Sequence, residues 1–286
     1  MVFNPFEPFE WQLAHGRRLT LGPKAHLMGI LNVTPDSFSD GGKFGGMEMA
    51  LKQARKMHRA GAAIIDIGGE STRPGAQSVS PLEEQRRILP VIEALADDKT
   101  VILSVDTWRA ETADLAVRAG AHIINDVWGF QKDPAIAAIA EKHSAGCVLM
   151  HTGRDRVKDS DPIKDQISFL ENSKKTALKA GVSLQHIVLD PGFGFAKDAV
   201  ENLTVLAYLE KLFALQCHIL TGTSRKRFIG EVTGRSVTRR DVGTAATTVV
   251  ARMKGSSVFR VHDVPKNADA LQMADAILKA QGFIAN

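Results

Sequence analysis

The sequence is poor in cysteine, and it has no long apolar segment. Cys147 and Cys217 are the only two cysteines among 286 residues, and both lie inside short apolar runs. This indicates buried thiols in a reducing compartment, so the cytoplasm is the expected location. No apolar run approaches the roughly 18 residues of a membrane span, and no membrane partner is expected. The N-terminal segment MVFNPFEPFEW is acidic and lacks the basic start of a signal peptide.

The sequence also lacks the signatures of several enzyme classes. No GxGxxG follows the first apolar run, and there is no Walker loop, no Ser-His-Asp set and no zinc cluster. Net charge is a mild +4, from 36 basic and 32 acidic residues, and the excess does not form one stripe. The densest basic segment, residues 224–241, suits a phosphorylated small molecule at least as well as a nucleic acid. No nucleic-acid partner is therefore expected.

What the sequence has in abundance is short apolar runs that end in a polar residue. Such runs are typical of parallel strands buried on both faces, and ligand-binding groups collect where those strands end. Eight runs of this kind predict one polar site to which every repeat contributes. The polar residues at or just after the ends are Asn32, Glu70, Asp106, Asn125, His151, Asp190, Ser224 and His262.

The runs alternate with helix-like segments in units of roughly thirty residues, which matches a (β/α)₈ barrel in number and length. We therefore predict a single α/β domain, a TIM barrel over residues 27–286, with a doubly wound open sheet as the alternative. Residues 1–26 are expected to form a lead-in with a short hairpin or plug strand at Leu19–Gly22. The predicted strands are Leu27–Leu31, Ala63–Ile67, Val101–Val105, His122–Ile124, Gly146–Met150, His186–Leu189, His218–Thr221 and Val258–Val261. The predicted helices are Met47–Ala60, one from Pro81 with Ser80 as its cap, Arg109–Ala119, Pro134–His143, Lys164–Lys179, Leu203–Phe213, 225–233, 241–253 and Asn267–Gln281.

Three of the strand-end residues suggest a site for a flat, nitrogen-rich ring. Asp106, Asn125 and Asp190 offer two carboxylates and an amide, and we expect Lys226 to face them from the seventh strand. Such a set suits a heterocycle with several N–H donors and one carbonyl, because each buried donor needs a partner. For any one of these residues, capping of the following helix is an equally good explanation. Three together favour a ligand.

A second group of residues suggests an anion site. The segment TSRKRFIG (223–230) places hydroxyls and three cations at the start of a helix, although a solvated helix start explains Arg225 and Arg227 equally well. Asn32 is a candidate ligand for Mg²⁺, and Arg73 is a candidate for gripping a phosphate. Arg260 and His262 occupy alternate positions of the last strand and are expected on one side of it.

These motifs together resemble the dihydropteroate synthase family of pterin-binding enzymes. The resemblance runs from Leu27 to Val264 and rests on MGILNVTPDSFSDGG, DIGGESTRPGA, SVDT, HIINDVWG, LDPGFGF, TSRKRFIG and RVHDV in the family's order. It implies a TIM barrel, usually dimeric. It also implies a transferase of folate biosynthesis that joins 6-hydroxymethyl-7,8-dihydropterin diphosphate to p-aminobenzoate with Mg²⁺ and releases diphosphate.

The resemblance also implies a role for individual residues. The set implied for catalysis is Asp40, Arg73, Asp106 and Lys226. The implied pterin pocket is Asp106, Asn125, Val127, Met150, Asp190, Phe195, Gly222 and Lys226, with Val148 also in its wall. The implied diphosphate site is Asn32, Thr72, Arg73, Arg260 and His262, with Asn32 as the metal ligand. The implied p-aminobenzoate site is Phe38, Thr72, Pro74, Phe195 and Arg227.

The residue types suit this reaction. An arylamine is unprotonated near neutral pH, so its attack needs no strong base, and cations with Mg²⁺ would stabilise the departing diphosphate. We therefore expect an SN1-like displacement, with Asp106 offsetting positive charge on the pterin methylene. Two other functions share the pocket: a pterin-dependent methyltransferase domain and a non-catalytic pterin-binding paralogue. The diphosphate residues Arg73, Arg260 and His262 argue against the first.

The sequence departs from the family pattern in three places. Ala196 stands where many members have glycine, and Arg227 stands where some have serine. The segment His151–Asp155 replaces a Met-rich stretch, and no role is assigned to it.

Overall fold

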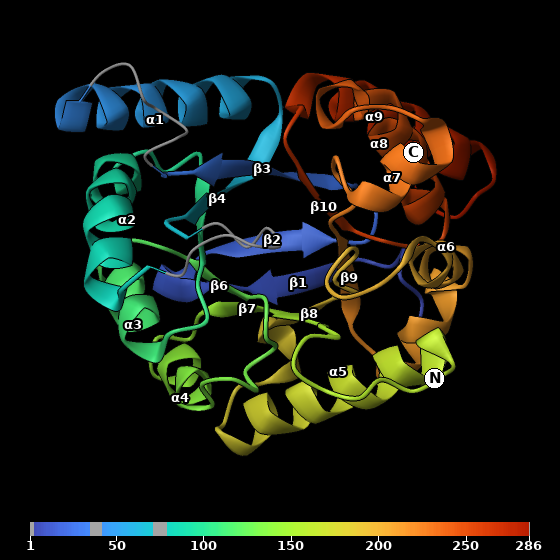
Figure 1. Ribbon diagram of the computed structural model, residues 1–286, viewed down its shortest axis with the longest axis horizontal. Coiled ribbons are helices and arrows are strands. Elements are labelled where there is room, and N and C mark those ends of the chain that lie inside the picture. The colour runs from blue at the N-terminus through green and yellow to red at the C-terminus, as the bar shows by residue number, and fades with distance from the viewer. Residues whose placement is uncertain (1–2, 35–41, 71–78, 286) are drawn as a thin grey trace.

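The structure is a computed structural model that describes residues 3–34, 42–70 and 79–285. Eight parallel strands form a closed barrel in the order β10-β3-β4-β5-β6-β7-β8-β9, and helices surround it (Figure 1). The predicted TIM barrel is confirmed. The barrel strands are β3 (His26–Asn32), β4 (Ala62–Gly68), β5 (Ile102–Asp106), β6 (Ile123–Asp126), β7 (Gly146–Met150), β8 (Ile187–Asp190), β9 (His218–Thr221) and β10 (Val258–Val261).

The helices follow the strands as expected, and several begin at other residues than predicted. The α-helices are α1 (Gly42–Arg59), α2 (Pro81–Ala96), α3 (Ala110–Arg118), α4 (Ala135–Lys142), α5 (Pro162–Lys179), α6 (Ala199–Ala207), α7 (Arg227–Thr233), α8 (Asp241–Met253) and α9 (Val264–Ala280). The 3-10 helices are η1 (Ala14–Gly16), η3 (Leu184–His186), η4 (Leu209–Leu215) and η5 (Val237–Arg239).

The sixth helix shows the largest error of prediction. The predicted helix Leu203–Phe213 is two pieces, since α6 begins at Ala199 and ends before η4. A capping box explains the early start: the Asp198 side chain accepts from the backbone N–H of Glu201, and the Glu201 side chain accepts in return. By contrast, the Ser80 cap of α2 is confirmed, because its Oγ accepts from the backbone N–H of Glu83.

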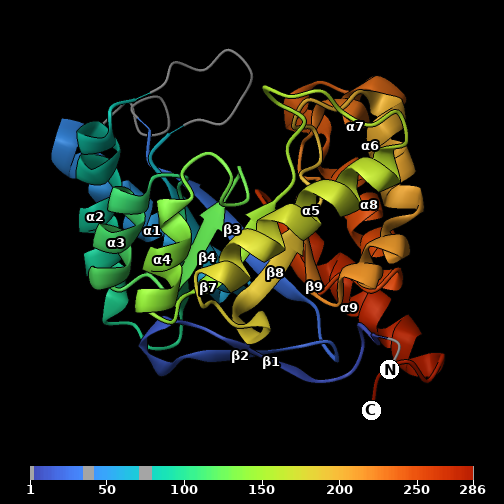
Figure 2. The same cartoon turned by 90° about the horizontal axis from the view of Figure 1, so that it is seen from below.

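An N-terminal hairpin covers one end of the barrel. Strand β1 (Phe9–Gln12) pairs with β2 (Arg18–Leu21) in an antiparallel sheet of its own, which crosses beneath the barrel (Figure 2). The expected plug at Leu19–Gly22 is therefore one strand of a complete hairpin. Trp11 is fully buried there, and its Nε1–H donates to the carbonyl oxygen of His186 at 2.8 Å.

The interior of the barrel is layered. An apolar cluster joins Trp11, Leu13 and Leu21 of the lead-in to a single side chain from every barrel strand, which gives this end a dry core. Side chains two residues further along a strand point the same way, so the next inward positions form the following layer. Those positions include Asp66, Ser104, Asn125, Asp190 and Arg260. Interior polarity therefore begins one layer above the apolar cluster, toward the carboxyl ends of the strands. The strand residues of the apolar layer are Met28, Ile64, Ile102, Ile123, Val148, Val188, Leu220 and Val258.

Two further findings concern the chain as a whole. Both cysteines are buried and free, as predicted. Within residues 3–34, 42–70 and 79–285, no helix has the length and apolar character needed to cross a membrane.

Gly120 ends the turn after α3 with φ +119°, and a Cβ there would lie 2.5 Å from that of Ala96. A larger residue would therefore separate α3 from α2.

Candidate functional site

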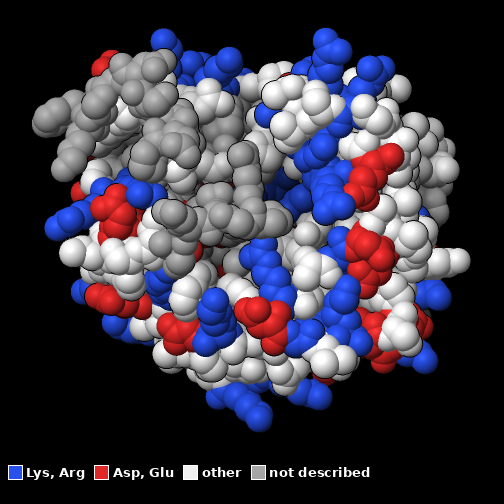
Figure 3. Space-filling model, viewed as in Figure 1, with Lys and Arg blue, Asp and Glu red and all other residues white. Residues whose placement is uncertain are grey.

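A deep cleft opens at the carboxyl ends of the barrel strands. Its volume is about 1230 Å³, and its lining runs from Ile30 and Asn32 on β3 to His262 after β10. Seven of the lining side chains are lysine or arginine and two are acidic. In Figure 3 the basic side chains gather around the central hollow of this face and toward α7. The excess of positive charge favours an anionic ligand.

Three polar side chains lie at the ends of β5, β6 and β8, as the sequence predicted. Asp106 and Asn125 sit side by side, because the two residues are partners in the β5–β6 register. Asp190 lies across the mouth, beneath Gly222, where an added Cβ would approach its Oδ2 to 3.8 Å. All three are buried. A buried carboxylate beside an amide needs hydrogen-bond donors, which a ligand rich in N–H groups provides.

Burial changes the acidity of both carboxyl groups. Desolvation raises the pKa of Asp106 above its ordinary value, against the attraction of Arg260 and with the repulsion of Asp66. Desolvation also raises the pKa of Asp190 to about 6, although the backbone N–H of Gly192 donates to its Oδ1 at 2.7 Å. Both groups therefore hold their charge less firmly than an exposed aspartate does.

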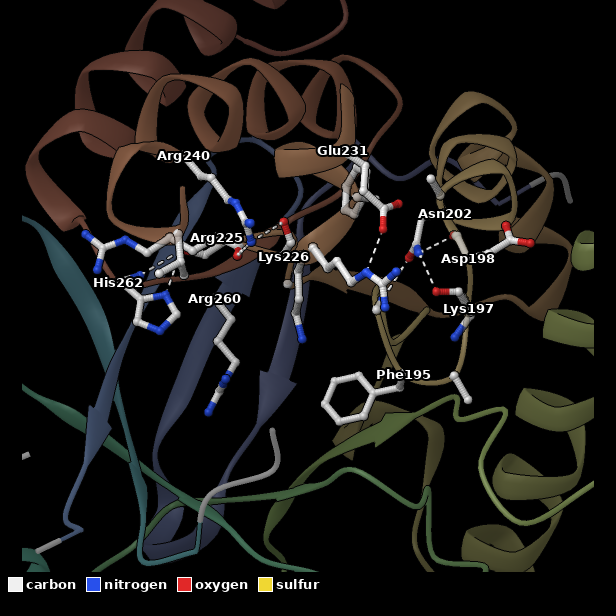
Figure 4. A pocket seen from close by; sticks show the side chains of 18 of the residues that line it. Phe195, Lys197, Asp198, Asn202, Arg225, Lys226, Glu231, Arg240, Arg260 and His262 are labelled. Carbon is white, nitrogen blue, oxygen red and sulfur yellow. Dashed lines mark hydrogen bonds and ion pairs between the residues drawn. The ribbon is translucent and has the colours of Figure 1, made fainter. Parts of the chain in front are cut away.

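Lys226 does not lie on a strand, which corrects the prediction that it faces the cup from the seventh strand. It is the N-cap residue of α7, and its stem reaches back over the Gly-rich turn after β8. Its Nζ lies 4.2 Å from the centre of the Phe195 ring. Figure 4 shows Lys226, Arg260 and Phe195 directed toward the same space. Burial, with a smaller contribution from the positive charge of Arg260, lowers the pKa of Lys226 to about 8, while Asp190 opposes the shift.

One wall of the cleft is apolar. Val127, Met150 and Phe195 form a small buried cluster of their own, with Trp128 packed against it. The three predicted wall residues are therefore together, and they offer a flat surface to a ring. Val148 does not belong to this wall. It lies one layer deeper, in the apolar cluster above the hairpin, because it precedes Met150 by two residues on β7.

The opposite side of the cleft carries Asn32, Arg260 and His262. The guanidinium of Arg260 contacts two carboxylates: its Nε donates to Asp66 at 2.6 Å, and its Nη2 donates to Asp106 at 2.7 Å. The Nδ1 of His262 lies 2.9 Å from the hydroxyl of Ser224, which also accepts the backbone N–H of His262. These contacts hold Arg260 against the carboxylates of Asp66 and Asp106, and they hold His262 against the loop after β9.

Known proteins with similar sequences belong to a family that binds a ligand of the kind this cleft suits. The profile described as "pterin binding enzyme" matches residues 28–262. Dihydropteroate synthase of Bacillus subtilis is 48% identical over 264 residues, covering 92% of each chain, and that of Clostridium beijerinckii is 44% identical, covering 92% of this chain and 98% of its own. The chain belongs to the pterin-binding enzyme family. Since its relatives over nearly their whole length are dihydropteroate synthases, it is a transferase.

Solved structures agree with the sequence matches. Dihydropteroate synthase of Clostridium difficile, determined in the presence of pteroic acid, superimposes with a TM-score of 0.87 at 44% identity, covering 90% of this chain and 98% of that one. The enzyme of Xanthomonas albilineans with 4-aminobenzoic acid gives 0.88 at 41% identity, covering 94% and 98%. The barrel is therefore that of this family.

The three cations at the start of α7 all line the cleft of this pterin-binding enzyme, and two of them have acidic partners. Arg225 is bonded to Asp241 through its Nε at 2.7 Å. The side chain of Arg227 is 89% exposed, and it pairs with Glu231 one turn along the helix. Lys226 lies beside Phe195, whereas Arg225 and Arg227 are paired with acidic residues of α8 and α7.

Two of the eight polar strand ends belong to structural ion pairs, so the prediction that every repeat serves the site is wrong. Glu70 accepts from Arg109 at 2.6 Å, between the barrel and α2. His151 is fully buried, and its Nε2 lies 2.9 Å from Asp165 of α5. Arg156 also donates to Asp165, so His151–Asp155 anchors a loop to α5.

Five predicted site residues belong to the two segments outside the described residues. Their implied roles stay predictions. They are Phe38, Asp40, Thr72, Arg73 and Pro74.

Sequence reasoning missed three charged residues near the site. Asp66 is fully buried inside the apolar run of β4. Lys197 follows the Gly-rich turn, and its Nζ donates to the carbonyl oxygen of Gly192 at 2.8 Å; burial lowers its pKa to about 7. The guanidinium of Arg154 lies 4.7 Å from the centre of the Phe195 ring. The clearest signal was Asp66, since a lone carboxylate within a buried strand needs partners.

Proposed function

We propose that this chain joins 6-hydroxymethyl-7,8-dihydropterin diphosphate to p-aminobenzoate, forming 7,8-dihydropteroate and diphosphate. The observation that carries the proposal is the cup of Asp106, Asn125 and Asp190, set between an apolar wall and a cationic rim. Among the solved relatives, one structure contains 4-aminobenzoic acid and another contains 7,8-dihydropteroate. A pterin ring supplies the N–H donors that the cup requires, and a diphosphate supplies the negative charge that the rim requires.

The proposed pterin site uses the two faces of the ring and its edge. Carboxylates of Asp106 and Asp190 accept N–H groups from the edge, and Asn125 supplies an amide beside Asp106. Met150 and Phe195 contact the ring from the apolar wall. Lys226 stabilises the edge that carries the carbonyl oxygen. A site of this kind discriminates against an analogue that lacks the N–H groups by about 10⁴-fold, because its buried acceptors then stay unpaired.

The proposed diphosphate site includes Asn32, Arg260 and His262. Asn32 ends β3 and lines the same cleft as Arg260, so its amide oxygen is a hard ligand beside the expected phosphate position. These residues fit Mg²⁺, which typically takes one or two protein oxygens and fills its shell with phosphate and water. When bound, the ion would neutralise charge on the departing diphosphate.

The proposed chemical step is an SN1-like displacement. The C–O bond to diphosphate breaks first, and the electron pair leaves with the diphosphate. The carboxylate of Asp106 would offset positive charge on the pterin methylene, and the arylamine nitrogen then forms the new C–N bond and loses its proton to solvent. In this order the amine does not assist departure. The rate should therefore depend weakly on arylamine nucleophilicity, and a steep dependence would contradict the mechanism.

The reaction is tested by mixing the protein, Mg²⁺, dihydropterin diphosphate and p-aminobenzoate, and by measuring dihydropteroate by chromatography. Formation that requires both substrates and falls when a sulfonamide competes with p-aminobenzoate supports the proposal. Pterin binding without any product would refute it. Omitting Mg²⁺ with a chelator separately tests the metal.

We propose further that the protein is a cytoplasmic homodimer. The two buried free thiols support a reducing compartment. The adjacent helices α8 and α9 expose Val242, Val250, Met273 and Ile277, which suits a second copy of this chain. Met273→Glu should shift sedimentation toward the monomer, whereas Val157→Glu, at a side chain outside these helices that is 95% exposed, should not. A wild-type monomer at high concentration would refute the dimer.

A further inference from the structure

Asp66 is the most heavily hydrogen-bonded carboxylate beneath the mouth of the barrel, and no role in the reaction has yet been given to it. It lies within β4, and it has no exposed surface. Its Oδ1 accepts the hydroxyl of Ser104 at 2.6 Å. Its Oδ2 accepts the amide N–H of Asn125 at 3.1 Å and the Nε–H of Arg260 at 2.6 Å. Asp66 therefore joins β5, β6 and β10 within the interior layer that also holds Asn125 and Asp190 of the cup.

The first consequence concerns Asn125. An ionised carboxylate accepts hydrogen bonds and cannot donate one, so the Nδ2 of Asn125 must face Asp66. The amide oxygen is then turned away from Asp66. Asn125 lies beside Asp106 in the β5–β6 register, so a ligand in the cup would meet this amide through its free oxygen, an acceptor. Asp66 thus decides which end of the amide a ligand meets.

The second consequence concerns Arg260. Its guanidinium is shared between two carboxylates, those of Asp66 and Asp106. The three groups together carry one net negative charge when both carboxylates are ionised. The charge of Arg260 is consequently divided between Asp66 and Asp106. Asp106 therefore keeps part of its negative charge, with which it can accept N–H groups of a ligand. The two short contacts also fix the direction of the guanidinium across the barrel.

We propose that Asp66 is a positioning residue for pterin recognition, which orients the amide of Asn125 and the guanidinium of Arg260 without touching the substrate. The inference rests on the proposed function, since it takes a pterin as the ligand of the cup. It gives a reason for a buried carboxylate–arginine pair inside the barrel, because the desolvation cost of such a pair leaves it with little contribution to stability.

The principal test is Asp66→Asn in the full-length protein. Binding of 6-hydroxymethylpterin, an unreactive probe, is measured by calorimetry, and the KM values of both substrates are measured separately. We expect pterin affinity to fall about 10- to 100-fold, the loss typical when a partner of a ligand-contacting side chain is removed. The KM for p-aminobenzoate should change by less than about 3-fold, because the amine does not meet Asn125.

Two control variants separate positioning from stability. Asp275→Asn breaks the contact between Asp275 and the Nε of Arg252, which is also 2.6 Å long and lies near Gly22 at the other end of the barrel. It should lower the midpoint of unfolding and leave pterin affinity unchanged. Ser104→Ala removes one bond to Asp66 and keeps the contacts to Asn125 and Arg260, so it should change pterin affinity by less than about 3-fold.

A double variant covers the case in which Asp66→Asn does not fold because Arg260 loses its partner. Asp66→Asn with Arg260→Gln removes both charges, and it is compared with Arg260→Gln alone. The double variant should bind the probe at least about 10-fold more weakly, since Asn125 has lost its orienting carboxylate.

The outcomes are distinct. Equal pterin affinity in the double variant and Arg260→Gln, or affinity in Asp66→Asn within about 3-fold of wild type, overturns the inference. Equal weakening of both substrates in Asp66→Asn also overturns it, because that pattern indicates general damage. A wild-type protein that binds the probe and makes no dihydropteroate refutes the proposed reaction and leaves the binding comparison intact.

Discussion

The two ends of the barrel each bury an arginine against a carboxylate, and the surroundings of the two pairs differ. At the hairpin end, the Nε of Arg252 lies 2.6 Å from Asp275, and its remaining donors reach the backbone oxygens of Ser256 and Gly22. At the mouth, the Nε of Arg260 also lies 2.6 Å from Asp66, and its Nη2 meets a second carboxylate. The first arginine fastens chain segments, whereas the second sits among charges that a ligand can rearrange.

The difference teaches how one barrel separates stability from binding. The hairpin end also holds an apolar layer inside the barrel, to which Trp11 and all eight strands contribute. The mouth holds Asp106, Asp190 and Lys226 with pKa values shifted toward neutrality by burial. Perturbed groups of this kind cluster at functional sites, where their charge is available to a ligand. Changes at the two ends should therefore affect different measurements.

The largest expected effect comes from Lys226→Ala at the mouth. Losing the buried cation beside Phe195 should reduce kcat/KM by about 10³-fold, because a preorganised donor in a water-poor site is lost. The matched control is Arg227→Ala, at the neighbouring exposed cation, which should cost less than about 10-fold. Steady-state kinetics of both variants measure the two losses of kcat/KM. Equal losses would remove the distinction between the inward and the outward cation.

The second prediction concerns Trp11→Ala at the hairpin end. It should lower the free energy of unfolding by about 3–5 kcal/mol, the usual cost of deleting a large buried ring. Urea unfolding measures this change, and kcat per folded molecule should stay within about 2-fold of wild type. Leu184→Ala, at a partly exposed site on the same side, should cost less than about 0.5 kcal/mol. A Trp11→Ala variant that kept its stability and lost turnover would contradict the assignment of stability to the hairpin end and of binding to the mouth.

The third prediction uses pH to test the mouth alone. Pterin binding needs ionised Asp106 and Asp190, whose pKa values are raised, and a protonated Lys226, whose pKa is lowered to about 8. The value of kcat/KM should therefore fall as pH drops below about 7, where Asp106 begins to take up a proton, and fall again above about 8, where Lys226 loses one. In Arg260→Gln the acidic fall should move to higher pH, because Arg260 lowers the pKa of both carboxyl groups. An unchanged acidic limb in this variant would show that these carboxylates do not control binding.

The smallest effect is expected at the turn between the two substrate regions. Ala196 has φ +52°, in the left-handed region that glycine favours, which gives a reason for the glycine of many family members. Ala196→Gly should stabilise the protein by up to about 1 kcal/mol, since relief of strain exceeds the added chain entropy. Ala199→Gly, at the first turn of α6, should instead destabilise it by about 0.5–1 kcal/mol. Thermal midpoints of the two variants should therefore move in opposite directions.

Most of the barrel was predictable from the sequence, because strands buried on both faces leave continuous apolar runs. The errors fall where local hydrogen bonds set a boundary, as the Asp198 capping box does for α6. The cup was predictable as well, since strand ends share one rim. Asp66 was not, because its meaning depends on Arg260, 194 residues away along the chain. Long-range partners of this kind are set by barrel closure and leave no local pattern.

The hairpin has a consequence for the order of events during synthesis. Trp11 bonds to His186, 175 residues later, and Arg252 bonds to Gly22, which is 230 residues earlier. The segment that leaves the ribosome first therefore finds its partners only after most of the barrel has been made. Until then Trp11, Leu13 and Leu21 lack the strands that cover them. The N-terminal segment is thus synthesised first, and it can close the base of the barrel only after the strands that cover it have left the ribosome.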